Sequence, residues 1–581
     1  MSWNIKGRLK EIMATERGVS PKERGGRLAV ALVWPGDYRT GMSALGFLSV
    51  YGFLNQRSDV LAERFFWPDG RLAKEYERGG EPLLSLESAR PLAEFDLVAA
   101  SLSLENDYWY LPRILQAGNL APLRCDRDEF DPPVLVGGIG PWSNPWPLMP
   151  FADLILTGEA EAAWPQLLSV LGDIPASLPK QGRVSLMGRK TPGSLNPGEV
   201  MEPFVPPGEG FHDSALHPIK PAFLAWPPPA GLLPPVSPII TPSAEFSDVK
   251  LVEISRGCPY GCRFCMAGFL YRPHRPWPLD SILAALGEPE FSNEKVGLVS
   301  PAPADHPQLP ELLDILFSQN RLVTMSSLRL TAITPLLAEK LAAGRLWGAA
   351  VAPEAGSQRL RNIINKDLTE AEILAGARLL AEAGLKKLKL YFMIGLPNET
   401  DDDLAELAEL CAKIREATRL AKTWPELQVS LANFTPKPHT PFEDAPIETE
   451  AGFKRKGKYV AQQLKGIPRL SVNLDSPLWA IVQGLLARGG AESYQLVMAL
   501  LNNQGRLKPA LAEIGYGPSH SIHSPWPKDK PKPWRVVVPA AGFDCLASEV
   551  LRAGQALITT ACPPAGNCGR CRACLKDDFV V

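Results

Sequence analysis

Two long stretches of the chain alternate short apolar runs with segments whose apolar residues recur at helical spacing. In the first stretch the apolar runs cover residues 28–34, 60–66, 97–101, 134–136 and 153–157. In the second they cover residues 250–255, 296–300, 323–327, 346–352, 387–394 and 428–434. Helical spacing lies between the runs, for example over residues 43–55, 309–318, 335–343 and 370–383. Because continuous apolar strands separated by helices are typical of parallel sheets, the pattern predicts an α/β protein.

The same pattern divides the chain into five parts. We predict a doubly wound, Rossmann-like domain over residues 1–173 and a partial barrel of six β/α units over residues 248–445. Residues 174–247 are rich in Pro and form an expected extended linker. Residues 446–534 are expected to be mostly helical, and residues 535–581 form a Cys-rich tail.

Composition and charge exclude several classes of protein. The 581 residues carry a formal net charge of −2, so the whole-chain charge does not indicate a nucleic-acid partner. No apolar run is long enough to span a bilayer, and the N-terminus carries no apolar signal region. Eight of the ten cysteines fall into two groups, 258–265 and 545–574, which indicates metal binding in a reducing compartment. We therefore expect a cytoplasmic protein without a membrane partner.

The first cysteine group directly follows a predicted strand. Cys258, Cys262 and Cys265 form a CxxxCxxC loop. Three thiolates could hold zinc, but structural zinc normally takes a fourth protein ligand, and no Cys or His follows at short spacing. An iron–sulfur cluster with one iron left open fits the spacing better.

This loop, with Phe264 before its third cysteine, resembles the cluster loop of the radical S-adenosylmethionine (radical SAM) superfamily. The resemblance implies that the three cysteines bind three irons of a [4Fe–4S] cluster and that S-adenosylmethionine (SAM) binds the fourth. With one electron from a flavodoxin- or ferredoxin-type reductant, the cluster would cleave SAM to methionine and a 5′-deoxyadenosyl radical.

Motifs at other strand ends of the barrel resemble the SAM-binding segments of that superfamily. Glu354 ends one strand and could accept from the SAM ammonium or ribose, and Arg359 or Arg361 could pair with a carboxylate. Active sites of parallel barrels lie at the carboxyl ends of the strands. The residues that we expect at SAM are Phe264, Ser327, Arg329, Glu354, Arg359 and Gly395. The usual Gly-Gly-Glu/Pro segment is absent, and Asp305 or backbone carbonyls would replace it. No catalytic side chain is identified.

A doubly wound domain ahead of such a loop resembles the cobalamin-binding branch of the superfamily, as an uncharacterised member. That resemblance implies a cobalamin contacted at strand ends by Ser101, Gly137 and Gly138, and methyl transfer to an unactivated atom. The Asp-x-His-x-x-Gly loop of many cobalamin domains is replaced by residues 37–41, and no histidine precedes His212. No histidine of this domain can therefore bind cobalt.

Three other functions remain open. An enzyme with an empty N-terminal domain would use the deoxyadenosyl radical to abstract hydrogen. A methylthiotransferase is disfavoured because it would need further cysteines in that domain, where only Cys125 is found. A non-catalytic iron–sulfur module for redox or assembly work is the alternative of a different class. The substrate is not readable from the sequence.

The tail carries the second cysteine group. Cys562, Cys568, Cys571 and Cys574 form a complete first shell for zinc or for a second [4Fe–4S] cluster, and their spacing does not decide between the two. The tail also resembles the C-terminal cysteine motif of the same uncharacterised branch.

Overall fold

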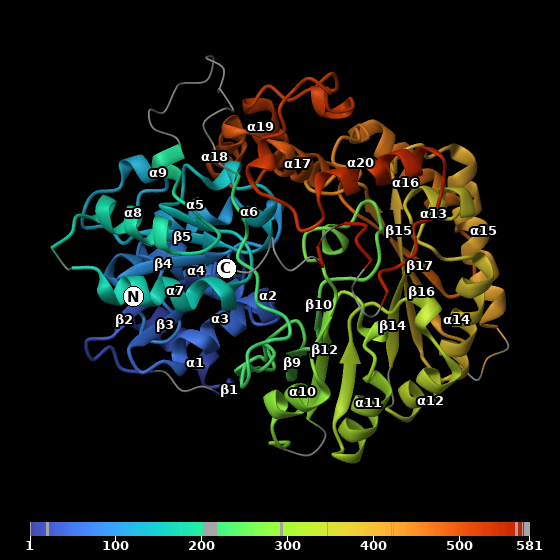
Figure 1. Ribbon diagram of the computed structural model, residues 1–581, viewed down its shortest axis with the longest axis horizontal. Helices are drawn as coiled ribbons and strands as arrows, with labels where there is room; N and C mark the ends of the chain where they lie inside the picture. The colour runs from blue at the N-terminus through green and yellow to red at the C-terminus, as the bar shows by residue number, and fades with distance from the viewer. Residues whose placement is uncertain are drawn as a thin grey trace.

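The computed structural model describes residues 2–18, 22–175, 177–200, 218–290, 294–344, 347–419, 421, 423–563, 568–571 and 573–574. An N-terminal α/β unit lies beside a C-terminal barrel wall (Figure 1). Helices α17 (Pro477–Arg488), α18 (Tyr494–Asn502) and α19 (Leu507–Glu513) bridge the two along one side (Figure 1).

The N-terminal unit is built on a six-stranded sheet in the order β3-β2-β4-β5-β6-β7. The strands are β2 (Leu28–Val33), β3 (Val60–Phe65), β4 (Leu97–Ser101), β5 (Val134–Gly137), β6 (Leu154–Leu156) and β7 (Ser194–Leu195). The first five are parallel, and all five predicted apolar runs form them. Strand order reverses between β2 and β4, and ligands of such sheets bind at the carboxyl ends beside this switch point.

Helices cover both faces of this sheet because its strands are apolar on both faces. They are α1 (Ser2–Met13), α2 (Tyr38–Gly41), α3 (Leu45–Gln56), α4 (Gly70–Gly79), α5 (Tyr110–Ala117), α6 (Ile139–Ser143), α7 (Ala160–Asp173), α8 (Lys180–Lys190) and α9 (Pro197–Val200). The charge of Arg64 in the buried strand β3 is compensated, because its guanidinium binds Glu16 at 2.7 Å and Glu87 at 2.6 Å.

The expected linker over residues 174–247 is partly wrong in its local structure. Helix α8 and strand β7 lie inside it, and β7 pairs antiparallel with β6, so the N-terminal unit extends past residue 173. Helix α8 was missed because a proline such as Pro179 normally interrupts a helix, whereas here Pro179 is the N-cap of α8. The described residues from 218 onward are extended and contact both units, through Ala222 beside Gly158 and Val236 beside Val252.

The barrel wall consists of two parallel sheets, β13-β12-β9 and β14-β15-β16-β17. Their strands are β9 (Val249–Glu253), β12 (Lys295–Val299), β13 (Leu322–Met325), β14 (Gly348–Glu354), β15 (Lys387–Ile394), β16 (Glu426–Asn433) and β17 (Leu470–Leu474). An isolated bridge between Leu328 and Val351 joins the two sheets. All six predicted strands are present. Strand β17 was missed because its side chains are largely exposed, so it carries no apolar run.

The helices outside this wall are α10 (Leu279–Leu286), α11 (Leu309–Ser318), α12 (Pro335–Ala343), α13 (Gln358–Ile363), α14 (Glu370–Glu382), α15 (Asp401–Ala417) and α16 (Glu450–Gln463). Helix α20 (Phe543–Gly554) leads into the tail. Two further short pairings complete the fold: β1 (Arg17–Gly18) with β8 (Ile239–Ile240), and β10 (Ser255–Arg256) with β11 (Arg275–Pro276).

Buried polar groups join the two units. The Nε2 atom of His439 lies 2.9 Å from the carbonyl oxygen of Ser143. The amide of Asn144 donates to the carbonyls of Ala487 and Gly489 at 3.0 and 2.9 Å, at the end of α17. Because these groups lie at the ends of α6 and α17 and in the loop after β16, the contacts fix how the two units sit against each other.

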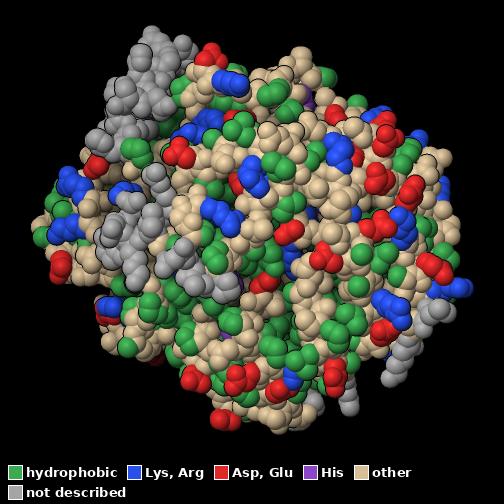
Figure 2. Space-filling model, turned by 45° about the vertical axis from the view of Figure 1, so that its right-hand side comes forward, with side chains coloured by type: hydrophobic (Ala, Val, Ile, Leu, Met, Phe, Trp, Pro, Cys, Tyr) green, Lys and Arg blue, Asp and Glu red, His purple; other side chains and the backbone are tan. Residues whose placement is uncertain are grey.

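Acidic and basic side chains are interspersed among the described residues on the face shown in Figure 2. This distribution agrees with the near-neutral net charge of −2. Among the described residues, no helix combines the length and the apolarity that crossing a membrane requires.

One pair of glycine substitutions tests the packing of the barrel against its outer helices. A Cβ atom at Gly356 would lie 2.1 Å from the backbone nitrogen of Leu407 in α15. Because backbone cannot yield as a side chain can, Gly356→Ala should lower the free energy of unfolding by about 1–3 kcal/mol. Gly7→Ala in α1 meets no atom within 4 Å and should raise it by about 0.5–1 kcal/mol. Denaturant unfolding of both variants checks this, and equal effects would contradict the packing.

Candidate functional site

The cluster loop is closed at its base by the pairing of β10 with β11. Two of its glycines are required by close backbone contacts. A Cβ atom at Gly257, whose φ is +74°, would lie 2.4 Å from the carbonyl oxygen of Tyr271. A Cβ atom at Gly268 would lie 2.5 Å from that of Tyr260. The loop therefore folds tightly back on itself around the three cysteines.

The structure brings Cys258, Cys262 and Cys265 together. Burial raises the pKa of Cys258 and Cys265, the latter to about 11, and repulsion from the neighbouring thiols adds to both shifts. Thiols bind iron as thiolates, so bound iron would supply the positive charge that offsets this cost. Within the described ranges no three His, Cys, Asp or Glu side chains surround a single-ion site. An iron–sulfur cluster in which each thiolate binds a different iron does not require the thiolates to surround one ion. The three cysteines therefore fit such a cluster.

Glu354 ends β14 in a left-handed backbone conformation, with φ of +68°. Its carboxylate lies 3.2 Å from Nζ of Lys366. Burial by itself would lower the pKa of Lys366, but the charges of Glu354 and Cys262 raise it above the usual value. Lys366 is therefore a protonated amine beside the cluster loop. The sequence motif contained this residue, but its role was missed because an isolated lysine is normally solvated.

Arg329 lies over the ring of Tyr260 in the cluster loop, 3.8 Å from its centroid. Its guanidinium donates to the carbonyls of Lys366 and Asp367. The Tyr260 hydroxyl donates to Asp305 at 2.5 Å, and the other oxygen of Asp305 is buried without a partner among the described residues. A buried carboxylate oxygen left free in this way fits an ammonium group, as the sequence suggested for Asp305. Ser327 is exposed at the same strand edge.

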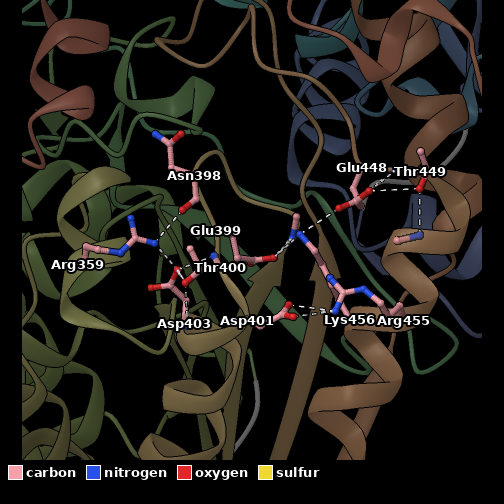
Figure 3. Close-up of polar contacts among 12 residues, drawn as sticks. Arg359, Asn398, Glu399, Thr400, Asp401, Asp403, Glu448, Thr449, Arg455 and Lys456 are labelled. Atoms are coloured by element: carbon pink, nitrogen blue, oxygen red, sulfur yellow. Dashed lines mark hydrogen bonds and ion pairs between the residues drawn. The ribbon is translucent and has the colours of Figure 1, made fainter.

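Arg359 lies in a second polar group, beside the turn after β15 (Figure 3). Gly395, the first residue after β15, belongs to that turn. Arg359 donates to the carbonyl of Asn398 at 2.8 Å and pairs with Asp403, which caps α15. Gly395 donates from its backbone to Glu399 at 2.9 Å. These contacts hold the turn in place, and direct contact of either residue with SAM stays a prediction.

Behind this turn, Glu399 binds Lys456 of α16 at 2.8 Å, and Glu448 binds the same amine at 3.1 Å (Figure 3). Gly395 has φ of +80°, and a Cβ atom there would lie 2.6 Å from the ring of Phe453. Phe264 packs against the apolar cluster that contains Leu360 and Phe434. The expected SAM residues thus lie in the cluster loop and at the ends of β13, β14 and β15.

A cavity of about 520 Å³ lies between the N-terminal sheet and the cluster loop. Ser101, Gly137 and Gly138 line it from the sheet, and Gly257 and Ala267 line it from the loop. Residues 37–41, which replace the histidine loop of many cobalamin domains, are not part of the lining. Gly138 is required by its own chain, since a Cβ atom would lie 2.3 Å from Leu102, but at Gly137 a Cβ atom would have room. The cavity therefore has small side chains on both sides.

A buried ion network borders this cavity, and sequence reasoning missed it. Arg275 binds Glu159 at 3.1 Å, and Arg256 binds Glu161 at 2.8 Å and Glu253 at 2.7 Å. Burial would raise the pKa of Glu161, but the Arg256 guanidinium lowers it below its usual value. Because Arg256 directly precedes Gly257, the network ties the cluster loop to the N-terminal sheet.

The tail docks onto the cluster loop. The backbone N–H of Cys562 donates to the carbonyl of Pro259 at 2.8 Å, and Arg263 of the loop binds Glu549 of α20 at 3.0 Å. Burial would lower the pKa of Arg272, but the neighbouring Cys562 and Cys571 raise it. These contacts place a cation beside the tail thiols.

The remaining tail cysteines lie in the same group. Burial raises the pKa of Cys574, and repulsion from Cys571, Cys562 and Cys568 adds to the shift. Cys545, the first cysteine of the second group, also interacts with Cys571. The four predicted ligands are therefore neighbours, and the metal that they bind stays a prediction.

Two family models match the chain. The model "Radical SAM proteins, N-terminal" matches residues 46–190, and the model "Radical SAM superfamily" matches residues 252–411. The uncharacterized protein MJ0966 of Methanocaldococcus jannaschii is 28% identical over 472 residues, which cover 79% of this chain and 88% of that protein. The uncharacterized protein MK0932 of Methanopyrus kandleri is 28% identical over 218 residues, or 33% of this chain and 39% of that protein.

Solved structures show more distant similarity. The methyltransferase TsrM of Kitasatospora setae, with tryptophan and a SAM analogue bound, matches with 13% identity and a TM-score of 0.49 over 82% of this chain and 99% of that one. The cobalamin-dependent SAM radical enzyme OxsB matches with 14% identity and a TM-score of 0.38 over 66% of this chain and 51% of that one. Similarity at this level carries no conclusion about ligands.

Replacing Cys258, Cys262 and Cys265 together by Ala should remove one iron–sulfur cluster, because the loop then offers iron no thiolate. We expect the triple variant, purified anaerobically, to contain about four fewer irons per chain than the unchanged protein. Iron and sulfide analysis measures this, with Cys411→Ala, a buried cysteine remote from both groups in sequence, as the control. Unchanged iron in the triple variant would disprove the assignment.

The tail should bind its metal independently of the loop. The triple loop variant should keep either one zinc or about four irons, and replacing the four tail cysteines by Ser should remove that metal alone. Elemental analysis of both variants distinguishes the two metals. A loop variant that is free of metal while its tail thiols are intact and reduced would refute the second site.

Proposed function

The chain belongs to the radical SAM superfamily, and on this premise we propose that it is a cobalamin-dependent methyltransferase that acts on an unactivated atom. The observation that carries the proposal is the single cavity of about 520 Å³ that is bordered both by the carboxyl edge of the N-terminal sheet and by the cluster loop. A cofactor in it would touch both units at once.

The cluster and SAM are assigned to the barrel. Cys258, Cys262 and Cys265 would hold the cluster. The free oxygen of Asp305 would accept from the SAM ammonium, and Glu354 and Lys366 would bind its polar groups. When bound, the cluster and SAM supply the radical and the methyl group, and cobalamin carries the methyl group.

Cobalamin is assigned to the cavity. The strand ends there carry Ala99, Ala100, Ser101 and Gly137, whose small side chains let a large flat ligand approach the backbone. The position beside the β2–β4 switch point is where doubly wound sheets bind ligands. None of the described residues that line the cavity is a histidine.

The chain's own residues would position the two reacting groups and exclude water. The Arg256 and Arg275 ion pairs hold the cluster loop against the sheet edge, on one side of the cavity. Because both guanidinium groups are already paired with carboxylates, they offer little to a substrate anion. The cavity wall is mainly apolar, with Leu32, Trp34, Leu135 and Trp164 among its residues, and this favours a dry reaction site.

Reconstitution with methylcobalamin tests the proposal. We expect the protein with a filled cluster to retain about one corrin per chain through a sizing column at micromolar concentration, and we expect Gly137→Val to lose it. This substitution narrows the cavity at a position where a Cβ atom has room. Gly517→Val, where a Cβ atom meets nothing within 4 Å, is the matched control.

Two outcomes would overturn this assignment. A protein with full iron that retains no corrin, yet forms 5′-deoxyadenosine when reduced with SAM, would be a hydrogen-abstracting enzyme with an empty N-terminal domain. A protein that cleaves no SAM would be an iron–sulfur module. If corrin binds, electron paramagnetic resonance of the Co(II) form should lack nitrogen superhyperfine splitting, and a clear nitrogen pattern would mean that cobalt has a nitrogen ligand.

A further inference from the structure

The tail and the cluster loop touch each other at the positions of their cysteines. The backbone N–H of Cys562 donates at 2.8 Å to the carbonyl of Pro259, the residue that follows Cys258. One hydrogen bond and a short piece of backbone therefore connect a tail cysteine with a loop cysteine. Cys571 is 2% exposed and packs in one apolar cluster with Phe269, the residue just after the loop. The two groups of cysteines thus meet in a buried contact.

Arg272 lies between the two groups. Its guanidinium donates to the carbonyl of Tyr260 in the loop at 3.3 Å. The charged groups that act on it most strongly are the tail thiols of Cys562, Cys571 and Cys545. Arg272 is 8% exposed, and within the described ranges no carboxylate forms an ion pair with it. Its buried Nε atom also has no acceptor among the described residues. Because buried charges are normally paired, this guanidinium indicates an anionic group at the tail thiols.

Four thiolates around either zinc or a [4Fe–4S] cluster carry net negative charge, so Arg272 fits both metals. The contacts of the tail distinguish them. A structural zinc would be needed to hold the tail in place, but other groups already hold it. Arg263 binds Glu549 at 3.0 Å, and Asn365 accepts from the backbone of Thr559 at 2.7 Å and donates to it at 3.1 Å. A redox role explains why the tail cysteines lie against the cluster loop.

The loop is covered on two sides. On the sheet side, Gly257 and Ala267 border the cavity of about 520 Å³. On the other side lies the tail, where Gly569 and Arg570 are exposed between Cys568 and Cys571. A protein that delivers electrons therefore meets the tail before the loop on this side.

We propose that Cys562, Cys568, Cys571 and Cys574 hold a second [4Fe–4S] cluster and that this cluster passes electrons to the cluster of the loop. One electron moves from a reduced flavodoxin or ferredoxin to the tail and then to the loop. Each donor is oxidised by one electron and each acceptor is reduced by one, and no bond or proton is transferred. Arg272 is a positioning residue that holds the tail thiols at the loop and stabilises the reduced tail cluster by its charge. This inference rests on membership of the radical SAM superfamily and not on cobalamin.

Electron paramagnetic resonance of the reduced full-length protein tests the contact between the clusters. The loop variant with Cys258, Cys262 and Cys265 replaced by Ala, and the tail variant with its four cysteines replaced by Ser, give the spectrum of each cluster alone. Because unpaired spins on neighbouring clusters couple, the spectrum of the unchanged protein should differ from the sum of the two. A tail that holds zinc, a tail without metal, or a spectrum equal to that sum would overturn the inference.

Stopped-flow reduction by reduced flavodoxin tests the electron path. In the tail variant the loop cluster should be reduced at least about tenfold more slowly, which corresponds to a barrier higher by about 1.4 kcal/mol. Mere disorder of the tail would uncover the loop and would speed the reaction instead. Equal or faster reduction in the tail variant would therefore contradict the path. Corrin retention is measured separately and reports on the proposed function alone.

The role of Arg272 has its own readout, the midpoint potential of the tail cluster in the loop variant. Arg272→Gln should make this potential more negative, because a nearby positive charge is lost, and Arg272→Lys should restore most of the shift. Arg455→Gln, an exposed residue of α16, is the matched control and should leave the potential unchanged. Loss of tail iron in Arg272→Gln and its retention in Arg272→Lys would equally show that the charge is required. An unchanged potential in Arg272→Gln with full iron would disprove this role.

Discussion

The buried ion pairs between the cluster loop and the N-terminal sheet are the interaction on which the site depends. Arg275 and Arg256 pair with Glu159 and Glu161, in the turn that follows β6. Transferring such charges from water is costly, so the pairs add little net stability, whereas removing one partner would leave a buried charge and cost about 3–5 kcal/mol. Their consequence is geometric: they hold one particular face of the loop against one particular sheet edge.

This constraint explains why the carboxyl edges of the two sheets face each other. The loops at the carboxyl edge of each parallel sheet carry polar and flexible residues. In either sheet alone, a ligand site at this edge would be open to water. Facing each other, the two edges enclose one cavity near the cluster loop and a second one between η2 (Glu105–Asp107) and α17. The tail closes the far side of the loop through Cys562 and Arg263. A cluster that oxygen destroys benefits from such cover.

Residues that bind ligands and residues that position them are closely interleaved here. Asp305 has a free oxygen beside the cluster loop, whereas Arg359 uses its guanidinium on Asn398 and Asp403. From the sequence, Arg359 was expected at SAM, and Asp305 was only one of two possible replacements for a missing family segment. Only the hydrogen-bond partners distinguish a group available to a ligand from one that holds a turn. Lys366 is the opposite case: its motif did not mark it as a site residue, and its charged neighbours in the structure do.

The sequence by itself determined the elements and the family. Continuous apolar runs predict buried parallel strands, and cysteine spacing predicts a cluster loop because three thiolates in one short loop can reach the irons of a single cluster. These signals are local, so they survive without the fold. Strand β17 and helix α8 lacked such signals, because one is exposed and the other begins at a proline.

Tertiary structure decided which groups face each other. Glu159 and Arg275 are 116 residues apart, and Asp107 and Asp475 come from different units. Which of these groups meet, and how far each is buried, depends on how two sheets dock, and docking is set by many weak contacts that no short segment encodes. For this reason the cluster loop could be predicted from residues alone, whereas the ion pairs beside it and the cavity that they border could not.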